Sequence, residues 1–308
     1  NISMDEPYAA ICGISEDEIR LQMKDDLGGL AKKLEITPEE ALMKLKENYD
    51  GYHFTSPSPD IYNPFSLLNA FADGKFGSYW FGSGTPTYLV KMLDKFGVKP
   101  SEIGRRQLKS SVFDAPTETM TDAVPLLYQS GYITIKDYNK MLDLYTLDIP
   151  NKEVRLGLME SLLPYYVNNK TPEATTMVAY LFYDIQNGDM DAALHRLQEF
   201  LSTIPYCDNT RFEGHYQQVF YIIFSLLGYY VDVEVRTPRG RVDIVLRTKT
   251  TLYVMELKLD KSAGEAMEQI DLKNYPERFA LCGLPVVKVA VSFDSERCTI
   301  GDWEIIGC

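Results

Sequence analysis

The apolar segment from Tyr253 to Leu259 (YVMELKL) places the tightest limit on how this chain can fold. Its length and aliphatic content predict a strand that runs through the middle of a sheet, covered on both faces. Because side chains alternate along a strand, Glu256 and Lys258 share one face of it. A carboxylate and an ammonium in such a place are costly unless they are paired, solvated at the strand end or bound to a metal ion.

The residues around this segment predict a mixed α/β domain over 205–308. Four stretches rich in Val, Ile, Leu and Tyr predict strands, at 231–237, 241–248, 251–259 and 285–293. A helix that ends on Gly228 precedes them. Another helix begins at the capping box Ser262-x-x-Glu265 and runs to near Pro276. The order αβββαβ is typical of a mixed sheet flanked by helices.

Asp243 lies on the strand before Glu256, and the turn between them, RTKT (247–250), is short. A hairpin there brings the two carboxylates side by side, together with Lys258. Two carboxylates at one spot repel each other unless a divalent cation lies between them, and oxygen ligands suit Mg²⁺ or Mn²⁺. The alternative is a buried ion pair between Asp243 and Lys258, which leaves Glu256 unexplained.

These residues form a recognisable motif. Asp243, twelve intervening residues and then Glu256-Leu257-Lys258 resemble the PD-(D/E)XK nuclease core, with Val242 where the proline of the motif often stands. Glu213 in the preceding helix resembles the helical acidic residue of that superfamily. Gln269 in the following helix resembles the extra polar residue of its downstream motif.

The resemblance implies hydrolysis of phosphodiester bonds in nucleic acid, with DNA as the expected substrate. It implies that Asp243 and Glu256 bind Mg²⁺ or Mn²⁺, and that Glu213 is a supporting ligand. Lys258 is expected to stabilise the developing charge or to orient water, and Gln269 to position water or substrate. Two of these residues have other interpretations: Thr210-x-x-Glu213 also fits a capping box, and Gln269 can simply solvate a helix face.

Residues 1–110 predict mostly helices joined by aromatic-rich turns, for which core packing is favoured over a ligand site. Ser15-x-x-Glu18 and Thr37-x-x-Glu40 fit capping boxes in a helical stretch over 15–48. Asn63-Pro64 and Thr85-Pro86 fit two further helix starts.

Residues 111–160 predict a helix, a turn, a strand, a polar turn and a second strand, an order that suits a small winged-helix unit. Since this segment carries little positive charge, a structural or protein-contact role is favoured over DNA binding. Residues 161–204 again predict helices, interrupted by NNKTPEA (168–174).

A second resemblance covers nearly the whole chain. The segments NYDGYHF, YNPFSLLNAF, SGTPT, LLYQSGYITIKDY and IPNKEVR resemble a bacterial family of AAA-ATPase-like proteins that end in a PD-(D/E)XK nuclease-like domain. It implies an ATPase-like helical part at 1–110, a winged-helix-like unit at 111–160, a helical connector at 161–204 and the nuclease-like domain at 205–308. Because no GxxxxGK[ST] occurs, we expect the family's phosphate-binding loop before Asn1 and no ATP hydrolysis by this chain alone.

The composition limits the partners. The net charge of −13 argues against a general nucleic-acid binder. Five basic residues near the predicted hairpin form either a local edge that holds phosphates or a solvated surface: Arg236, Arg239, Arg241, Arg247 and Lys249. The five cysteines form no CxxC pair, which disfavours a zinc site or a disulfide framework and favours the cytoplasm. No apolar run is long enough to predict a membrane span.

Three functions fit these observations. The first is a metal-dependent nuclease, favoured by the complete set of Asp243, Glu256 and Lys258. The second is a nuclease-like scaffold that binds nucleic acid or a protein without cutting, favoured by the acidic net charge. The third is a nucleotide-driven switch, in which an ATPase region outside this chain controls the C-terminal domain. The sequence leaves the oligomeric state open.

Overall fold

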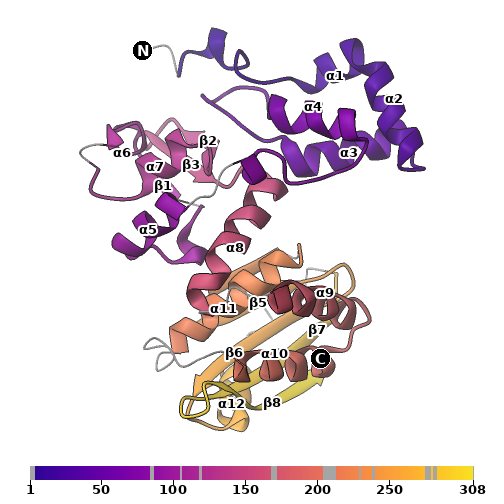
Figure 1. Cartoon of the computed structure of the whole chain (residues 1–308). Helices are drawn as coiled ribbons and strands as arrows, with labels where there is room; N and C mark the ends of the chain where they lie inside the picture. The colour runs from indigo at the N-terminus through magenta and orange to yellow at the C-terminus, as the bar shows by residue number, and fades with distance from the viewer. Residues whose placement is uncertain are drawn as a thin grey trace. The chain divides into compact units, whose positions relative to one another are not determined.

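The computed structural model describes residues 4–83, 87–104, 106–117, 120–167, 172–203, 213–228, 230–237, 240–274, 279 and 283–307. The chain divides into two compact units, Asn1–Ser161 and Leu162–Cys308 (Figure 1). The finer division into four parts stays a prediction. Within the described residues, every helix is too short or too polar to traverse the apolar core of a bilayer.

The first unit begins with a group of helices: the short 3₁₀ helix η1 (Glu6–Tyr8), then α1 (Glu16–Gln22), α2 (Lys24–Lys33), α3 (Pro38–Tyr49) and α4 (Pro64–Asp73). The predicted capping boxes at Ser15 and Thr37 are present, and the Asn63 side chain caps α4. The stretch over 15–48 is three helices, because the chain turns at Met23 and again after Lys33. The apolar faces of these helices share one buried core, which includes Tyr49 and Tyr62.

The rest of the first unit combines short helices with a small sheet. It contains η2 (Phe81–Ser83), α5 (Thr87–Lys95), η3 (Pro100–Glu102), β1 (Arg106–Leu108), α6 (Ser110–Phe113), α7 (Val124–Gln129), β2 (Thr134–Asn139) and β3 (Leu144–Asp148). The strands form an antiparallel sheet in the order β1-β3-β2. The predicted helix-strand-strand order over 124–148 is confirmed, whereas the winged-helix assignment stays a prediction. The predicted helix start at Thr85-Pro86 lies outside the described residues.

Aromatic residues of the turns pack into the core of the first unit, as expected. Tyr49 and Tyr62 are fully buried, and Tyr52 and Phe81 are 9% exposed. The Tyr49 hydroxyl also donates a hydrogen bond to the Gly77 carbonyl, which ties the end of α3 to the segment after α4.

The second unit is built on a five-stranded mixed sheet. The division between the two units falls within α8 (Lys152–Tyr166). The elements that follow are α9 (Pro172–Gln186), α10 (Met190–Ser202), α11 (Glu213–Leu226), β4 (Tyr230–Thr237), β5 (Gly240–Arg247), β6 (Leu252–Leu259), α12 (Ala263–Leu272), β7 (Val286–Asp294) and β8 (Thr299–Gly307). The strand order is β4-β5-β6-β7-β8, parallel only between β6 and β7. The apolar strand β6 is central, as predicted, while β8 was not anticipated.

The two faces of this sheet are covered by different helices (Figure 1). Helix α12 packs on one face, where Val254 of β6 and Ala290 of β7 belong to its apolar core. On the other face Phe293 of β7 stacks on Tyr216 of α11 and meets Phe220 of the same helix edge to face, and α10 contacts β8. Since alternate side chains of β6 point to opposite faces, Glu256 and Lys258 lie on the α12 face.

Candidate functional site

The hairpin of β5 and β6 brings Asp243 and Glu256 together. The antiparallel ladder runs from Arg247↔Leu252 to Ile244↔Met255, so Asp243 comes next, across from Glu256. There the Asp243 carboxylate accepts a hydrogen bond from the Leu257 backbone N–H at 2.8 Å. The side chain of Asp243 is thereby held against β6 at the point where the regular ladder stops.

Glu256 is almost completely buried, with 1% of its surface exposed. Its Oε1 accepts a hydrogen bond from Lys258 Nζ at 2.8 Å and another from Gln269 Nε2 of α12. Its Oε2 has no hydrogen-bond partner among the described residues. Glu256 and Lys258 thus form an ion pair, which gives Glu256 a partner that a pair between Asp243 and Lys258 alone leaves unexplained.

The electrostatics of Glu256 match this geometry. Burial, and next the negative charge of Asp243, raise the pKa of the Glu256 carboxyl to about 7, against the opposing effect of Lys258. A carboxylate that lies next to another carboxylate and keeps one buried oxygen unpartnered is poised to bind a cation. Hard oxygen ligands of this kind fit Mg²⁺ or Mn²⁺. Among the described residues, however, no group of three or more His, Cys, Asp or Glu side chains is arranged to hold a metal ion.

Helix α11 contributes a residue that the sequence did not single out. Gln217 is 7% exposed, and its Nε2 donates a hydrogen bond to the Asp243 carbonyl at 3.2 Å. It lies one helical turn after Glu213, so the i, i+4 spacing could have indicated it. Glu213 itself is the first residue of α11, and its side chain lies outside the described part of the chain, as does the competing cap residue Thr210.

The backbone beside Asp243 is strained. Glu234 of β4 has a φ of 53°, in the left-handed region that a non-glycine residue rarely adopts. It lies between the pairs Val233↔Ile244 and Val235↔Val242, and thus across from Asp243 on the outer side of β5. Conformations of this kind are typical of functional sites, where the surrounding structure maintains them.

The predicted basic edge is split by the sheet. Arg236 and Arg241 are paired across β4 and β5, at the end near Asp243, and Arg241 also contacts Glu234 at 3.3 Å. Arg247 is the last residue of β5, about 20 Å along the strand from Arg241, and Lys249 follows in the turn after it. Arg239 lies outside the described residues. Of the members of this set that the structure describes, Arg236 and Arg241 are the two that lie at the end of the strands near Asp243.

Residues 211–303 match the family model described as the PD-(D/E)XK nuclease superfamily. This stretch is a PD-(D/E)XK nuclease superfamily domain. The match contains Asp243, Glu256, Lys258, Glu213 and Gln269, and the five-stranded mixed sheet with its flanking helices is consistent with such a domain. PD-(D/E)XK nucleases typically use divalent metal ions.

A curated relative extends the similarity beyond this domain. An uncharacterized protein in the vnfD 5′ region of Azotobacter chroococcum mcd 1 is 31% identical over 317 residues, which cover 98% of this chain and 58% of the relative. The chain therefore spans 58% of the length of that protein. No solved structure matches the chain. Since the family match begins at residue 211, the AAA-ATPase-like resemblance of the preceding residues stays a prediction.

Proposed function

We propose that this chain is a metal-dependent nuclease that hydrolyses DNA phosphodiester bonds at the site of Asp243, Glu256 and Lys258. The observation that carries the proposal is the buried Glu256 carboxylate, with its unpartnered Oε2 and the charge of Asp243 beside it. Two adjoining carboxylates destabilise the fold unless a cation compensates them. The nuclease-superfamily match over 211–303 supports the same chemistry.

In this proposal Asp243 and Glu256 bind Mg²⁺ or Mn²⁺, and Glu213 is a supporting ligand. When bound there, the metal ion would supply Lewis-acid polarisation of the phosphodiester and would lower the pKa of a water molecule. Lys258, which donates to Glu256, keeps a positive charge where negative charge develops on the phosphate, or orients the attacking water. Gln269 donates to Glu256 from α12, and from there it positions water or substrate.

A cleavage assay with matched variants tests the proposal. Plasmid DNA, single-stranded DNA and RNA are incubated with the purified chain and Mg²⁺ or Mn²⁺. Glu256→Gln and Asp243→Asn preserve the side-chain shapes but remove the charges, and each is expected to lower the rate by at least about 100-fold. Asp302→Asn changes an exposed carboxylate of β8 and is the control. Equal cleavage by the wild type and both site variants refutes the proposal.

The second candidate is a scaffold that binds nucleic acid or a protein without cutting, regulated by an ATPase region outside this chain. The net charge of −13 and the split basic residues favour it. The AAA-ATPase-like and winged-helix-like resemblances of residues 1–160 also support it. Electrophoretic retardation of DNA without any metal-dependent cleavage favours this candidate over the nuclease. Neither proposal expects ATP turnover by this chain alone.

A further inference from the structure

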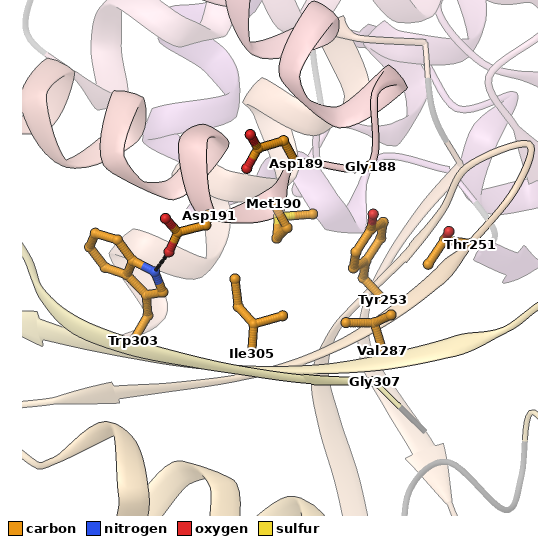
Figure 2. A pocket seen from close by; sticks show the side chains of 10 residues that line it. All are labelled: Gly188, Asp189, Met190, Asp191, Thr251, Tyr253, Val287, Trp303, Ile305 and Gly307. Atoms are coloured by element: carbon orange, nitrogen blue, oxygen red, sulfur yellow. Dashed lines mark hydrogen bonds between the residues drawn. The ribbon is translucent and has the colours of Figure 1, made fainter.

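A pocket of about 510 Å³ lies in the second unit (Figure 2). Its β6 and β7 residues, Tyr253 and Val287, pair with each other and alternate with Glu256, so the pocket lies on the sheet face opposite Glu256. It is bounded by the turn between α9 and α10 and by the ends of β6, β7 and β8. Trp303, Ile305 and Gly307 pair with Val291, Val289 and Val287. These β8 residues therefore point to the α10 and α11 face, away from α12.

Apolar and aromatic side chains form the middle of the pocket, and polar atoms make up a comparable share of its lining. Met190 lies above it, and Val287 and Ile305 lie below, between Trp303 at one end and Tyr253 at the other (Figure 2). Met190 and Tyr253 are 3% and 2% exposed, so packing fixes their positions. The volume lies within the usual range for small-molecule sites.

The charges at the rim have one sign. Asp191 accepts a hydrogen bond from Trp303 Nε1 at 2.8 Å, and Asp189 accepts one from the Ala192 backbone N–H at 2.9 Å. No lysine or arginine is among the described residues that line the pocket. The nearest basic group to these carboxylates in the described part of the chain is the exposed His195 imidazole, 3.8 Å from Asp191. Each carboxylate can accept further hydrogen bonds, since an ionised carboxylate has about four acceptor positions.

We propose that this pocket binds a small organic cation, namely an amine or guanidine attached to an apolar body. The apolar body lies between Met190 and Ile305, where it is removed from water. The cationic group reaches Asp191 or Asp189 through charge-assisted hydrogen bonds, and Asp191 is held in place by the hydrogen bond that it accepts from Trp303 Nε1. A neutral ligand of the same shape gains only the apolar contacts, and an anion is repelled.

The site is independent of the proposed nuclease activity, because its residues lie on the other face of the sheet. Titration with 2-phenylethylamine tests it, with the neutral 2-phenylethanol as the matched ligand. Trp303 fluorescence, recorded in a Trp80→Phe background, and the Met190 methyl NMR signal report on binding. We expect saturable binding of the amine, about tenfold tighter than that of the alcohol.

Variants locate the binding. Asp191→Asn keeps an acceptor for Trp303 Nε1, and Asp189→Asn keeps the helix cap. Each should weaken amine binding by about tenfold, whereas Asp302→Asn on the opposite sheet face and Asp243→Asn should leave it unchanged. Nα-acetyl-lysine amide tests whether the cation can also come from a protein side chain. Absence of saturable amine binding, or equal binding of amine and alcohol, overturns the proposal. This comparison uses the protein with an intact pocket, so it does not depend on whether the pocket variants fold.

Discussion

Replacing Glu256 with glutamine should stabilise the metal-free protein while it abolishes cleavage. The Glu256 carboxyl is buried beside Asp243, and its pKa is raised from 4.5 to about 7. A carboxyl whose folded pKa lies above its unfolded pKa is protonated in both states at low pH. As the pH rises from 4.5 to 7, the unfolded chain loses its proton first, so the free energy of unfolding falls. Glutamine has the same shape and no charge to bury.

The size of the effect follows from these two pKa values. Each unit of difference corresponds to about 1.4 kcal/mol, so ionised Glu256 costs the metal-free fold about 3 kcal/mol at pH 8. At pH 5.5 the pH is only one unit above the pKa of Glu256 in the unfolded chain, so the cost is about 1.4 kcal/mol. The advantage of Glu256→Gln should therefore roughly double between pH 5.5 and pH 8. Such a stabilising loss of function is typical of charges retained for catalysis.

Urea unfolding in EDTA measures this prediction. The chain has two tryptophans, Trp80 in the first unit and Trp303 in the second, so a Trp80→Phe background confines the fluorescence signal to the unit that contains Glu256. Mg²⁺ should then raise the unfolding midpoint of the protein with Glu256 intact more than that of the Glu256→Gln variant. If Glu256→Gln lowers the metal-free stability at pH 8, or if its effect does not depend on pH, the electrostatic reasoning is wrong.

Three further predictions concern single side chains. Lys258→Met should lower metal-dependent cleavage by at least about 100-fold, whereas Lys288→Met, which removes a similarly placed ion pair with Asp271 on the same sheet face, should leave the rate nearly unchanged. Gln217→Leu removes the hydrogen bond to the Asp243 carbonyl and should raise the metal concentration for half-maximal cleavage by about tenfold. If that concentration is unchanged, Gln217 does not position Asp243 for metal binding. Burial raises the pKa of Asp50 from 3.8 to about 6, so the free energy of unfolding of the first unit should fall by about 3 kcal/mol as the pH rises through that range. Asp50→Asn should abolish this decrease, which unfolding followed by Trp80 fluorescence measures.

Local signals in the sequence predicted most of the elements correctly. The capping boxes at Ser15, Thr37 and Ser262 form as expected, because each depends on residues only three positions apart. The apolar content of β6 predicted its central position. Strand β8 was missed because its sequence, TIGDWEIIG, mixes exposed polar residues with apolar ones, as an edge strand does.

The site was predicted in part, for reasons that depend on distance along the chain. Asp243 and Glu256 are joined by a short hairpin, so the spacing of the motif already brings their carboxylates together. Gln217 reaches Asp243 only because α11 packs across β5, and the strained backbone of Glu234 depends on the pairing of β4 with β5. The sequence placed Arg236 and Arg247 in one basic group. In the structure Arg236 lies beside the first residues of β5 and Arg247 is its last residue, so the length of the strand separates them.

The sequence by itself determined that two carboxylates and a lysine lie in one apolar hairpin, since alternation along a strand and a short turn leave few other arrangements. Only the tertiary structure decided how the charges are compensated. The packing of α12 directs Gln269 to Glu256, and the partners of Glu256 use one oxygen and leave the other unpartnered among the described residues. The pocket beside Trp303 likewise exists only because α10 packs on β8. Contacts between distant segments cannot be read from local patterns, because each depends on how whole elements pack.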